Sequence, residues 1–242
     1  MSAAAAFDAL AERYDEMWTH SLVGRLQRDA VWSEIDGLFQ PGEAVWDLGC
    51  GTGADAAWLA RKGVRVFASD ISPRMQEIAQ ARGVPVGPAP ASLDGVLSNF
   101  GVLNCIPDLR ALAEDLVRRM RPGGRLVFCV MGRFCLSETA WYLLAGRPRK
   151  AFRRWGGRAE AQPGGFPVWY PTVGELAAAF APHFRLVRWR GIGLLVPPSC
   201  TERAVRRFPR LLGGFAAADS VLARLPLLRG MADHRLLILV RT

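Results

Sequence analysis

The stretch VWDLGCGTGADAAWLA, residues 45–60, decides the fold. Its apolar start leads to Asp47, three glycines follow at alternate positions, and an amphipathic segment begins at Ala54. Glycines let a backbone turn sharply and approach a ligand without a Cβ atom in the way. The free N–H groups at the start of the following helix face that ligand. The stretch therefore predicts a strand, a ligand-binding turn and a helix.

Short apolar runs alternate with helix-length segments through the first half of the chain. The runs cover residues 45–48, 64–69, 93–98 and 124–131, and the amphipathic segments include 54–63 and 108–120. Ser72 and Asp108 stand where helix caps are needed. Continuous apolar strands separated by helices predict a parallel sheet covered on both faces. The proline-rich segment 84–92 is expected to form the short third strand, with a reduced crossover helix.

The alternation loosens after residue 131, where two irregular stretches appear, 132–170 and 192–232. A helix at 172–181 and strands at 184–191 and 234–241 complete the pattern. Parallel strands all end at one edge of a sheet, and ligands bind outside that edge. We therefore expect both irregular stretches to start above the binding crevice and to cover the substrate.

The expected fold is α/β, a doubly wound, Rossmann-like, mostly parallel seven-stranded sheet with an antiparallel last strand and helical lid insertions. We predict one domain with a helical cap, a cofactor-binding core, two lid insertions and a closing part. Their ranges are 1–40 for the cap, 41–131 for the core, 132–170 and 192–232 for the lid insertions, and 172–191 and 233–242 for the last helix and strands.

Composition places the chain among enzymes of the cytoplasm. Half of the 242 residues are hydrophobic and 22% are charged, which suffices for a sizeable core and excludes a disordered chain. No run reaches the roughly 18 apolar residues of a membrane span, and the N-terminus turns acidic at once, unlike a secretory signal. The five cysteines are scattered without a CxxC pair, so we expect reduced thiols and no metal site.

The formal net charge of +9 is unevenly placed, because residues 146–242 hold 17 of the 31 basic residues and 5 of the 22 acidic ones. Such asymmetry fits an acidic partner, whether a carrier protein, an anionic lipid surface, an acidic substrate or RNA. Because 29 of the 31 basic residues are arginine, a GC-rich coding sequence explains the excess equally well. Basic runs such as 147–158 are usually solvated, and the interleaved Phe152 and Trp155 make a docking surface the alternative.

Glycines alone also fit a loose dinucleotide-binding pattern, and neighbouring motifs sharpen the interpretation. Asp47 stands two residues before the first glycine, where it can accept from a cationic amine, and Asp70 ends the next strand, where it can hold a ribose. With these acids, the sequence resembles the class I S-adenosylmethionine-dependent methyltransferases of the small-molecule type. The resemblance rests on DLGCGTG, ASDIS, LDGVLSNFGVLNCIPDL and RPGG, and on FDALAERYDEMW (7–18), similar to the cap of small-molecule members.

The resemblance implies S-adenosylmethionine as cofactor, with Asp47 near its amine, Asp70 on its ribose, and Ile71 and Met75 beside adenine. It places the following residues around the cofactor: Tyr14, Asp47, Gly49, Cys50, Gly51, Gly53, Asp70, Ile71, Met75, Ser98, Asn99 and Phe100. The acid-free stretch from residue 78 to 93 departs from the family pattern, because many members place an acid there for adenine. Helix capping by Asp70 and core packing by Met75 are the alternatives.

The sulfonium methyl is already activated, so the enzyme has to align an acceptor, exclude water and remove a proton where the acceptor carries one. His234, beside Asp233, is a candidate base, although capping or hydrogen bonding explains it as well. His20 and Tyr14 in the cap are further catalytic candidates, Tyr14 as a hydrogen-bonding lid over the cofactor. The acceptor wall is predicted to contain Phe166, Trp169 and Tyr170, unless they only pack the lid.

We therefore expect methyl transfer to a small-molecule acceptor, at oxygen, in a biosynthetic pathway, by in-line displacement in a lidded apolar pocket. The acceptor could be acidic or carrier-linked. One alternative is an RNA methyltransferase, against which stands the lack of an appended RNA-binding module. The other is a non-catalytic S-adenosylmethionine-binding protein that docks on a carrier protein or a membrane. The sequence leaves the oligomeric state open.

Overall fold

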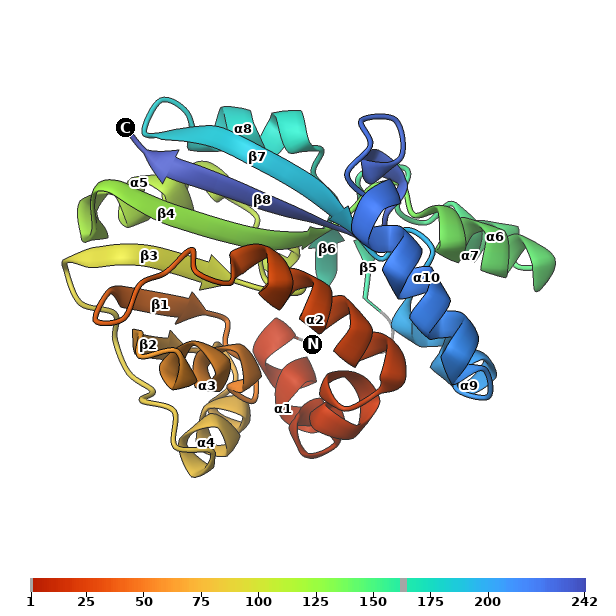
Figure 1. The fold of residues 1–242 in the computed structure, drawn as a ribbon, viewed down its shortest axis with the longest axis horizontal. Coiled ribbons are helices and arrows are strands. Elements are labelled where there is room, and N and C mark those ends of the chain that lie inside the picture. Colours follow the sequence, from red (N-terminus) through yellow and green to blue (C-terminus); the bar gives the residue numbers. More distant parts are fainter. Residues whose placement is uncertain (1, 162–164) are drawn as a thin grey trace.

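The computed structural model describes residues 2–161 and 165–242 and contains a six-stranded sheet in the order β2-β1-β3-β4-β8-β7 (Figure 1). Strands β1 to β4 run parallel, and β8 is antiparallel to both β4 and β7. The bounds are β1 Ala44–Leu48, β2 Arg65–Ser69, β3 Leu93–Ser98, β4 Met120–Met131, β7 Phe184–Ile192 and β8 His234–Arg241. The Rossmann-like fold and the antiparallel last strand are thus confirmed.

The predicted count of seven strands is wrong by one. Segment 84–92 was expected to be the third strand in sequence, and it contributes only a single bridge, between Val86 and Ala68 of β2. Three prolines in this segment explain the difference, because proline has no N–H to continue a ladder. The edge of the sheet is therefore β2.

Two hydrophobic cores lie on opposite faces of the sheet. One holds Val31 and Leu59 against Val127 of β4, and helices α2 (Leu22–Ile35), α3 (Ala54–Arg61) and α4 (Pro73–Ala81) contribute to it. The other packs α5 (Leu109–Arg119) and α8 (Val173–Phe180) against Leu126 and Phe128. Successive residues of β4 thus point into different cores, as expected of a sheet covered on both faces.

The N-terminal segment is helical, as the sequence predicts. It consists of α1 (Ala3–Tyr14), the π-helix η1 (Asp15–Thr19) and α2, and Ser2 and Ser21 cap the two α-helices through their hydroxyl groups. Figure 1 shows α1 and α2 at the end of the sheet toward which the arrowheads of β1 and β3 point. The helical cap therefore lies at the carboxyl edge of the parallel strands.

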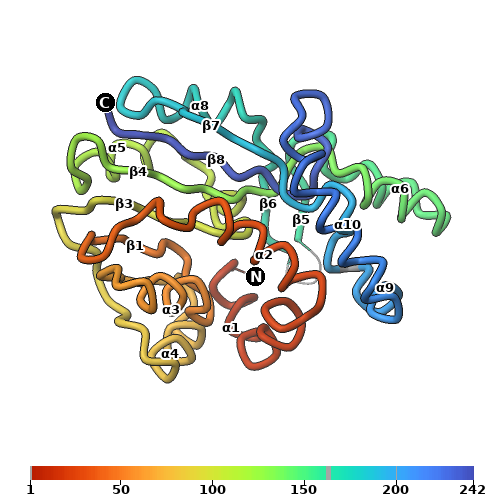
Figure 2. The backbone as a smooth tube through the Cα atoms, in the orientation of Figure 1, coloured from red at the N-terminus to blue at the C-terminus, as the bar shows by residue number. Residues whose placement is uncertain are grey.

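The two insertions leave the sheet at one corner, because His234 pairs with both Met131 of β4 and Ile192 of β7. Figure 2 shows both insertions extending from this corner. The first holds α6 (Leu136–Leu144), α7 (Pro148–Ala151), β5 (Arg158–Glu160) and β6 (Pro167–Trp169), and η2 (Leu103–Cys105) precedes it. The second holds η3 (Ser199–Thr201), α9 (Glu202–Val205), α10 (Pro209–Leu222) and η4 (Arg229–Met231). No helix in residues 2–161 and 165–242 is long and apolar enough to span a membrane.

Candidate active site

The glycine turn after β1 is left-handed at each of its three glycines, with φ of 74° at Gly49, 52° at Gly51 and 81° at Gly53. A Cβ on Gly49 would lie 2.5 Å from a methyl of Val102, so glycine is required there for packing. Gly51 is open instead, and the nearest atom to its built Cβ is Cε1 of Tyr14, at 3.9 Å. Val102 therefore packs against the turn at Gly49. At Gly51 there is open space toward Tyr14, where a ligand can approach the backbone.

Asp70 holds the glycine turn in place from the end of β2. Its Oδ2 accepts from the backbone N–H of Gly51 at 2.8 Å, and its Oδ1 accepts from the N–H of Ser72 at 2.9 Å. The helix cap of α4 is Ser72, whose hydroxyl accepts from the N–H of Met75, so Asp70 is not the cap. Burial raises the pKa of the Asp70 carboxyl, and its backbone hydrogen bonds oppose that rise.

Asp47 is a buried carboxylate, 1% exposed, and its Oδ2 has no hydrogen-bond partner in the part of the chain described. Burial and the negative charges of Asp55 and Asp70 raise the pKa of Asp47 well above its usual range, while Arg28 opposes the rise. Asp47 therefore lies near two further carboxylates and only one guanidinium. This excess of negative charge favours a cationic ligand at the glycine turn.

Arg28 and Asp55 form a buried ion pair beneath the glycine turn. Asp55 also accepts from the indole N–H of Trp32 at 2.7 Å and from the Asn99 amide at 3.1 Å. The sequence pattern indicates no role for either member of the pair. A signal for Asp55 existed, since it is the one acid of α3 and stands among alanines in its first turn. The predicted residue Asn99 thus orients this pair.

Tyr14 covers the glycine turn from the end of α1, and its ring packs on Trp18 with centroids 4.9 Å apart. Burial raises the pKa of the Tyr14 phenol, so it remains a neutral donor at neutral pH. The cap is fastened by Asp15, which accepts from the Thr52 hydroxyl at 2.6 Å and pairs with Arg82. On the same helix face, Asp8 accepts from the hydroxyl of Ser72, the cap of α4, and Glu12 forms an ion pair with Arg74 of α4. His20 is exposed, and its catalytic role stays a prediction.

Phe100, directly after β3, has a positive φ of 51°, which is uncommon for a residue with a side chain. The Arg28 guanidinium lies over the Phe100 ring, 4.9 Å from the ring centroid. His234 meets it edge to face, with ring centroids 5.3 Å apart. Phe100 thus lies between the charged cluster under the glycine turn and the start of β8.

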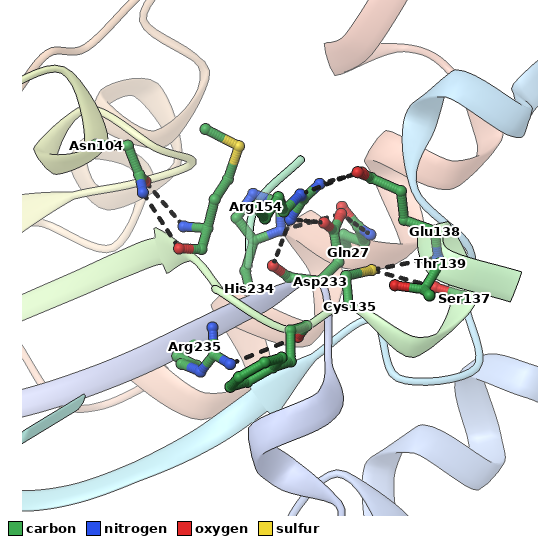
Figure 3. Close-up of polar contacts among 12 residues, drawn as sticks. Gln27, Asn104, Cys135, Ser137, Glu138, Thr139, Arg154, Asp233, His234 and Arg235 are labelled. Carbon is green, nitrogen blue, oxygen red and sulfur yellow. Dashed lines mark hydrogen bonds and ion pairs between the residues drawn. The ribbon is translucent and has the colours of Figure 1, made fainter. Parts of the chain in front are cut away.

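His234 belongs to a buried ionic network (Figure 3). Its Nδ1 lies 3.3 Å from Oδ2 of Asp233, and Asp233 also pairs with Arg154 at 2.9 Å and accepts from Gln27 at 3.2 Å. Arg154 in turn binds Glu138 of α6. Although burial acts in the opposite direction, the neighbouring His234 and the Arg154 guanidinium hold the pKa of Asp233 well below its usual range. The network ties the first insertion to the imidazole.

The three residues of the predicted acceptor wall are held by contacts within the protein. Phe166 is buried against Phe7 of α1, with ring centroids 5.8 Å apart, and Tyr170 is buried under the Arg154 guanidinium at 5.5 Å. The side-chain amide of Asn104 donates to the carbonyl of Trp169 at 2.6 Å. The Asn104 side chain also forms hydrogen bonds with the backbone N–H and carbonyl of Met131. Asn104 therefore fastens β6 to the end of β4, which the sequence did not reveal. Contact of the three aromatic residues with an acceptor stays a prediction.

The remaining predicted residues differ in their surroundings. Met75 is 1% exposed and packs in the interior, whereas Ile71 is 67% exposed beside Asp70. The Ser98 hydroxyl donates to the carbonyl of Leu48 at 2.8 Å and so joins β3 to β1. Burial raises the pKa of the Cys50 thiol, which stays neutral. The roles of these residues toward a cofactor stay predictions.

A sequence profile described as a methyltransferase domain matches residues 24–182, more than half of the chain. The chain belongs to this methyltransferase family. A curated relative, the demethylmenaquinone methyltransferase of Mycobacterium sp. (strain KMS), is 32% identical over 163 residues, 61% of this chain and 69% of the relative. Among solved structures, an S-adenosylmethionine-dependent methyltransferase from Mesorhizobium loti has a TM-score of 0.59 at 18% identity and covers 88% of this chain and 98% of its own.

A second solved structure is the 1,6-didemethyltoxoflavin-N1-methyltransferase of Burkholderia thailandensis with bound 1,6-didemethyltoxoflavin and S-adenosylhomocysteine. It has a TM-score of 0.57 at 22% identity and covers 98% of this chain and 86% of its own. The cofactor of our methyltransferase is S-adenosylmethionine. Its residues fit that group, because the unpartnered Asp47 oxygen suits an ammonium and the open face of Gly51 leaves room for a ligand against the backbone.

Proposed function

We propose that this methyltransferase transfers a methyl group to an oxygen of a small-molecule acceptor, with His234 as the base. The carrying observation is the buried pair of His234 and Asp233, 3.3 Å apart, next to the Phe100 ring at the end of β3. Phe100 belongs to the motif LDGVLSNFGVLNCIPDL of the family resemblance, which places it directly after β3 and near the sulfonium. An imidazole on a carboxylate at that place can take a proton from an acceptor hydroxyl.

In the proposed site, Asp47 receives the ammonium of the cofactor, Asp70 holds its ribose hydroxyls, and Tyr14 closes the glycine turn. When bound, S-adenosylmethionine supplies a methyl group on a sulfonium that is ready for in-line displacement. The excess negative charge around Arg28 favours this cationic cofactor over its neutral product, which assists product release.

The proton step falls to His234 in this proposal. Asp233 is ionised at neutral pH, because its pKa lies well below the usual range. Its negative charge stabilises the imidazolium that forms when Nε2 takes the acceptor proton. Arg154 and Gln27 hold the carboxylate of Asp233 3.3 Å from Nδ1 of His234, which forms no hydrogen bond with a described residue, so we expect this hydrogen bond to form when the acceptor binds. A base is required for an alcohol or a phenol and not for a carboxylate.

The relatives support a small acceptor from a biosynthetic pathway. The curated relative is named for demethylmenaquinone, and the Burkholderia thailandensis structure contains 1,6-didemethyltoxoflavin. Neither name refers to a nucleic acid. The aromatic residues Phe166, Trp169 and Tyr170 lie in or beside β6, at the corner where the first insertion returns to the sheet, and we assign them to the apolar side of the acceptor pocket.

The experiment uses methyl-labelled S-adenosylmethionine with a panel of phenols, hydroquinones, carboxylic acids and amines, followed by extraction and mass spectrometry. We expect methylated hydroxyl products, and a loss of about 10²-fold or more in kcat for His234→Gln with unchanged calorimetric binding of S-adenosylhomocysteine. The matched control is His183→Gln, because His183 precedes β7 at the opposite edge of the sheet.

Three outcomes would contradict the proposal. Methylation of amines alone would remove the oxygen acceptor, and full activity of the His234→Gln variant would remove the base. Cofactor binding without turnover on any acceptor would favour the non-catalytic alternative.

A further inference from the structure

The insertions place a groove of about 460 Å³ outside the site described above. It is lined by residues of α6, of the following turn and of the α9 region: Trp141, Tyr142, Arg147, Thr201, Arg203, Ala204 and Arg207. In Figure 1, α6, α7 and α9 project from the corner of the sheet, away from β1 and β2. The α9 side of the groove lies beyond residue 182, where the match to the family profile ends.

Positive charge accumulates around this groove without compensation. The exposed basic residues are Arg147, Arg149, Lys150, Arg203, Arg206, Arg207 and Arg210. None of them forms an ion pair with a residue that the structure describes. The segments 134–151 and 199–214 contain one acid each, Glu138 and Glu202.

Both of those acids are already engaged. Glu138 is buried and binds Arg153 and Arg154, so two cations of the basic run 147–158 point inward. Glu202 accepts from the backbone N–H groups of Leu22 and Val23 at 2.9 and 3.0 Å. The remaining cations of this surface are therefore left for an anionic partner.

Large apolar side chains stand exposed among these cations. They are Trp141, Leu143, Leu144, Phe208 and Leu211, and Leu144 is 88% exposed at the end of α6. Exposed leucine and aromatic side chains beside arginine and lysine are typical of interfacial elements that enter the boundary between lipid headgroups and acyl chains. RNA-binding surfaces stack bases on aromatic rings, and stacking does not account for the exposed leucines here.

We propose that α6, α7, α9 and the start of α10 form a peripheral membrane-binding surface for bilayers that contain anionic phospholipids. Arg147, Arg203 and Arg207 take lipid phosphate groups at the groove, and Leu143 and Leu144 enter the interface. This binding does not depend on which acceptor is methylated. It concentrates the enzyme at a lipid surface, where an apolar acceptor partitions.

The test is sedimentation of the full chain with phosphatidylcholine vesicles that contain or lack phosphatidylglycerol, over a range of salt concentrations. We expect binding that requires the anionic lipid and weakens with salt. Arg203→Glu with Arg207→Glu should weaken binding about tenfold or more, because each cation near the surface is attracted to the anionic lipid. Leu143→Ser with Leu144→Ser should weaken the part of binding that persists at high salt.

The matched control is Arg61→Glu with Arg65→Glu, an equal charge reversal at α3 and β2 on the other end of the sheet. It should bind vesicles like the unaltered protein. Equal binding to neutral and anionic vesicles, or equal losses in both charge-reversal variants, would overturn the proposal. So would RNA binding that depends on Arg203 and Arg207 without any vesicle binding. Thermal unfolding verifies that each variant is folded.

Discussion

The rings of Phe100 and His234 meet edge to face, with centroids 5.3 Å apart and planes at 89°. Phe100 follows β3 and His234 begins β8, so the contact crosses from one strand end to another at the corner where both insertions leave the sheet. Arg28 lies on the same phenyl ring, 4.9 Å from its centroid. One side chain therefore links the charged cluster under the glycine turn to the proposed base.

The left-handed backbone at Phe100 leads to an unusual order of stability. Phe100→Gly should be more stable than Phe100→Ala by about 1 kcal/mol, because a side chain costs about that much at positive φ. Both variants should lose kcat, because the ring no longer supports His234. Urea unfolding measures the difference, and a more stable alanine variant would show that the φ of 51° is not strained.

Gly49 and Gly51 should respond differently to alanine. Gly49→Ala adds the clash with Val102 to the cost of its backbone, and adding Val102→Ala should restore part of the stability. Gly51→Ala should lose only about 1–2 kcal/mol and should weaken S-adenosylhomocysteine binding. The control is Gly83→Ala, which shares the positive φ and has open space around it. Binding by Gly51→Ala as tight as by the control would argue against the ligand at this turn.

Ionised Asp47 should lower the stability of the fold and strengthen the binding of S-adenosylmethionine. Its folded-state pKa is raised, so its ionisation destabilises the fold as pH rises above about 4, and Asp47→Asn removes that cost. We expect a higher thermal midpoint at pH 7 without ligand and weaker binding of S-adenosylmethionine by calorimetry. Asp115→Asn on the surface of α5 is the control. A lower midpoint, with binding unchanged, would contradict the assigned electrostatics.

The fold was largely predictable because its signals are local. The runs 93–98 and 234–241 match β3 and β8, and Asp108 and Thr172 begin helices as their sequence context indicates. Segment 84–92 fails as a strand because its prolines break the ladder that a short apolar run predicts.

The supports of the site were not predictable, because they join residues far apart in the chain. Arg154 reaches Asp233 across 79 positions, and no periodicity within the basic run distinguishes it from the exposed Arg149. Asn104 likewise bridges Met131 and Trp169 through tertiary contacts alone. Such pairings depend on how insertions return to the sheet, which the sequence pattern does not specify.

Arg154 should stabilise the fold more at neutral pH than at acid pH, because it pairs with ionised Asp233. The pKa of Asp233 is lowered in the folded state, so its contribution is present above about pH 4 and is lost as pH falls further. Arg154→Gln leaves a buried charge poorly compensated and should cost about 3–5 kcal/mol at pH 7. Urea unfolding at pH 7 and at acid pH should show a smaller difference in the acid. Equal costs at both pH values would contradict the pairing, and the exposed Arg149→Gln is the control.

The most direct measurement is a crystal structure of the protein with S-adenosylhomocysteine. We expect its ribose hydroxyls on Asp70, its amine toward Asp47, its chain against Gly51 under Tyr14, and its sulfur toward the Phe100 and His234 rings. A ribose that contacts neither Asp70 nor the glycine turn would contradict the assignment of this site.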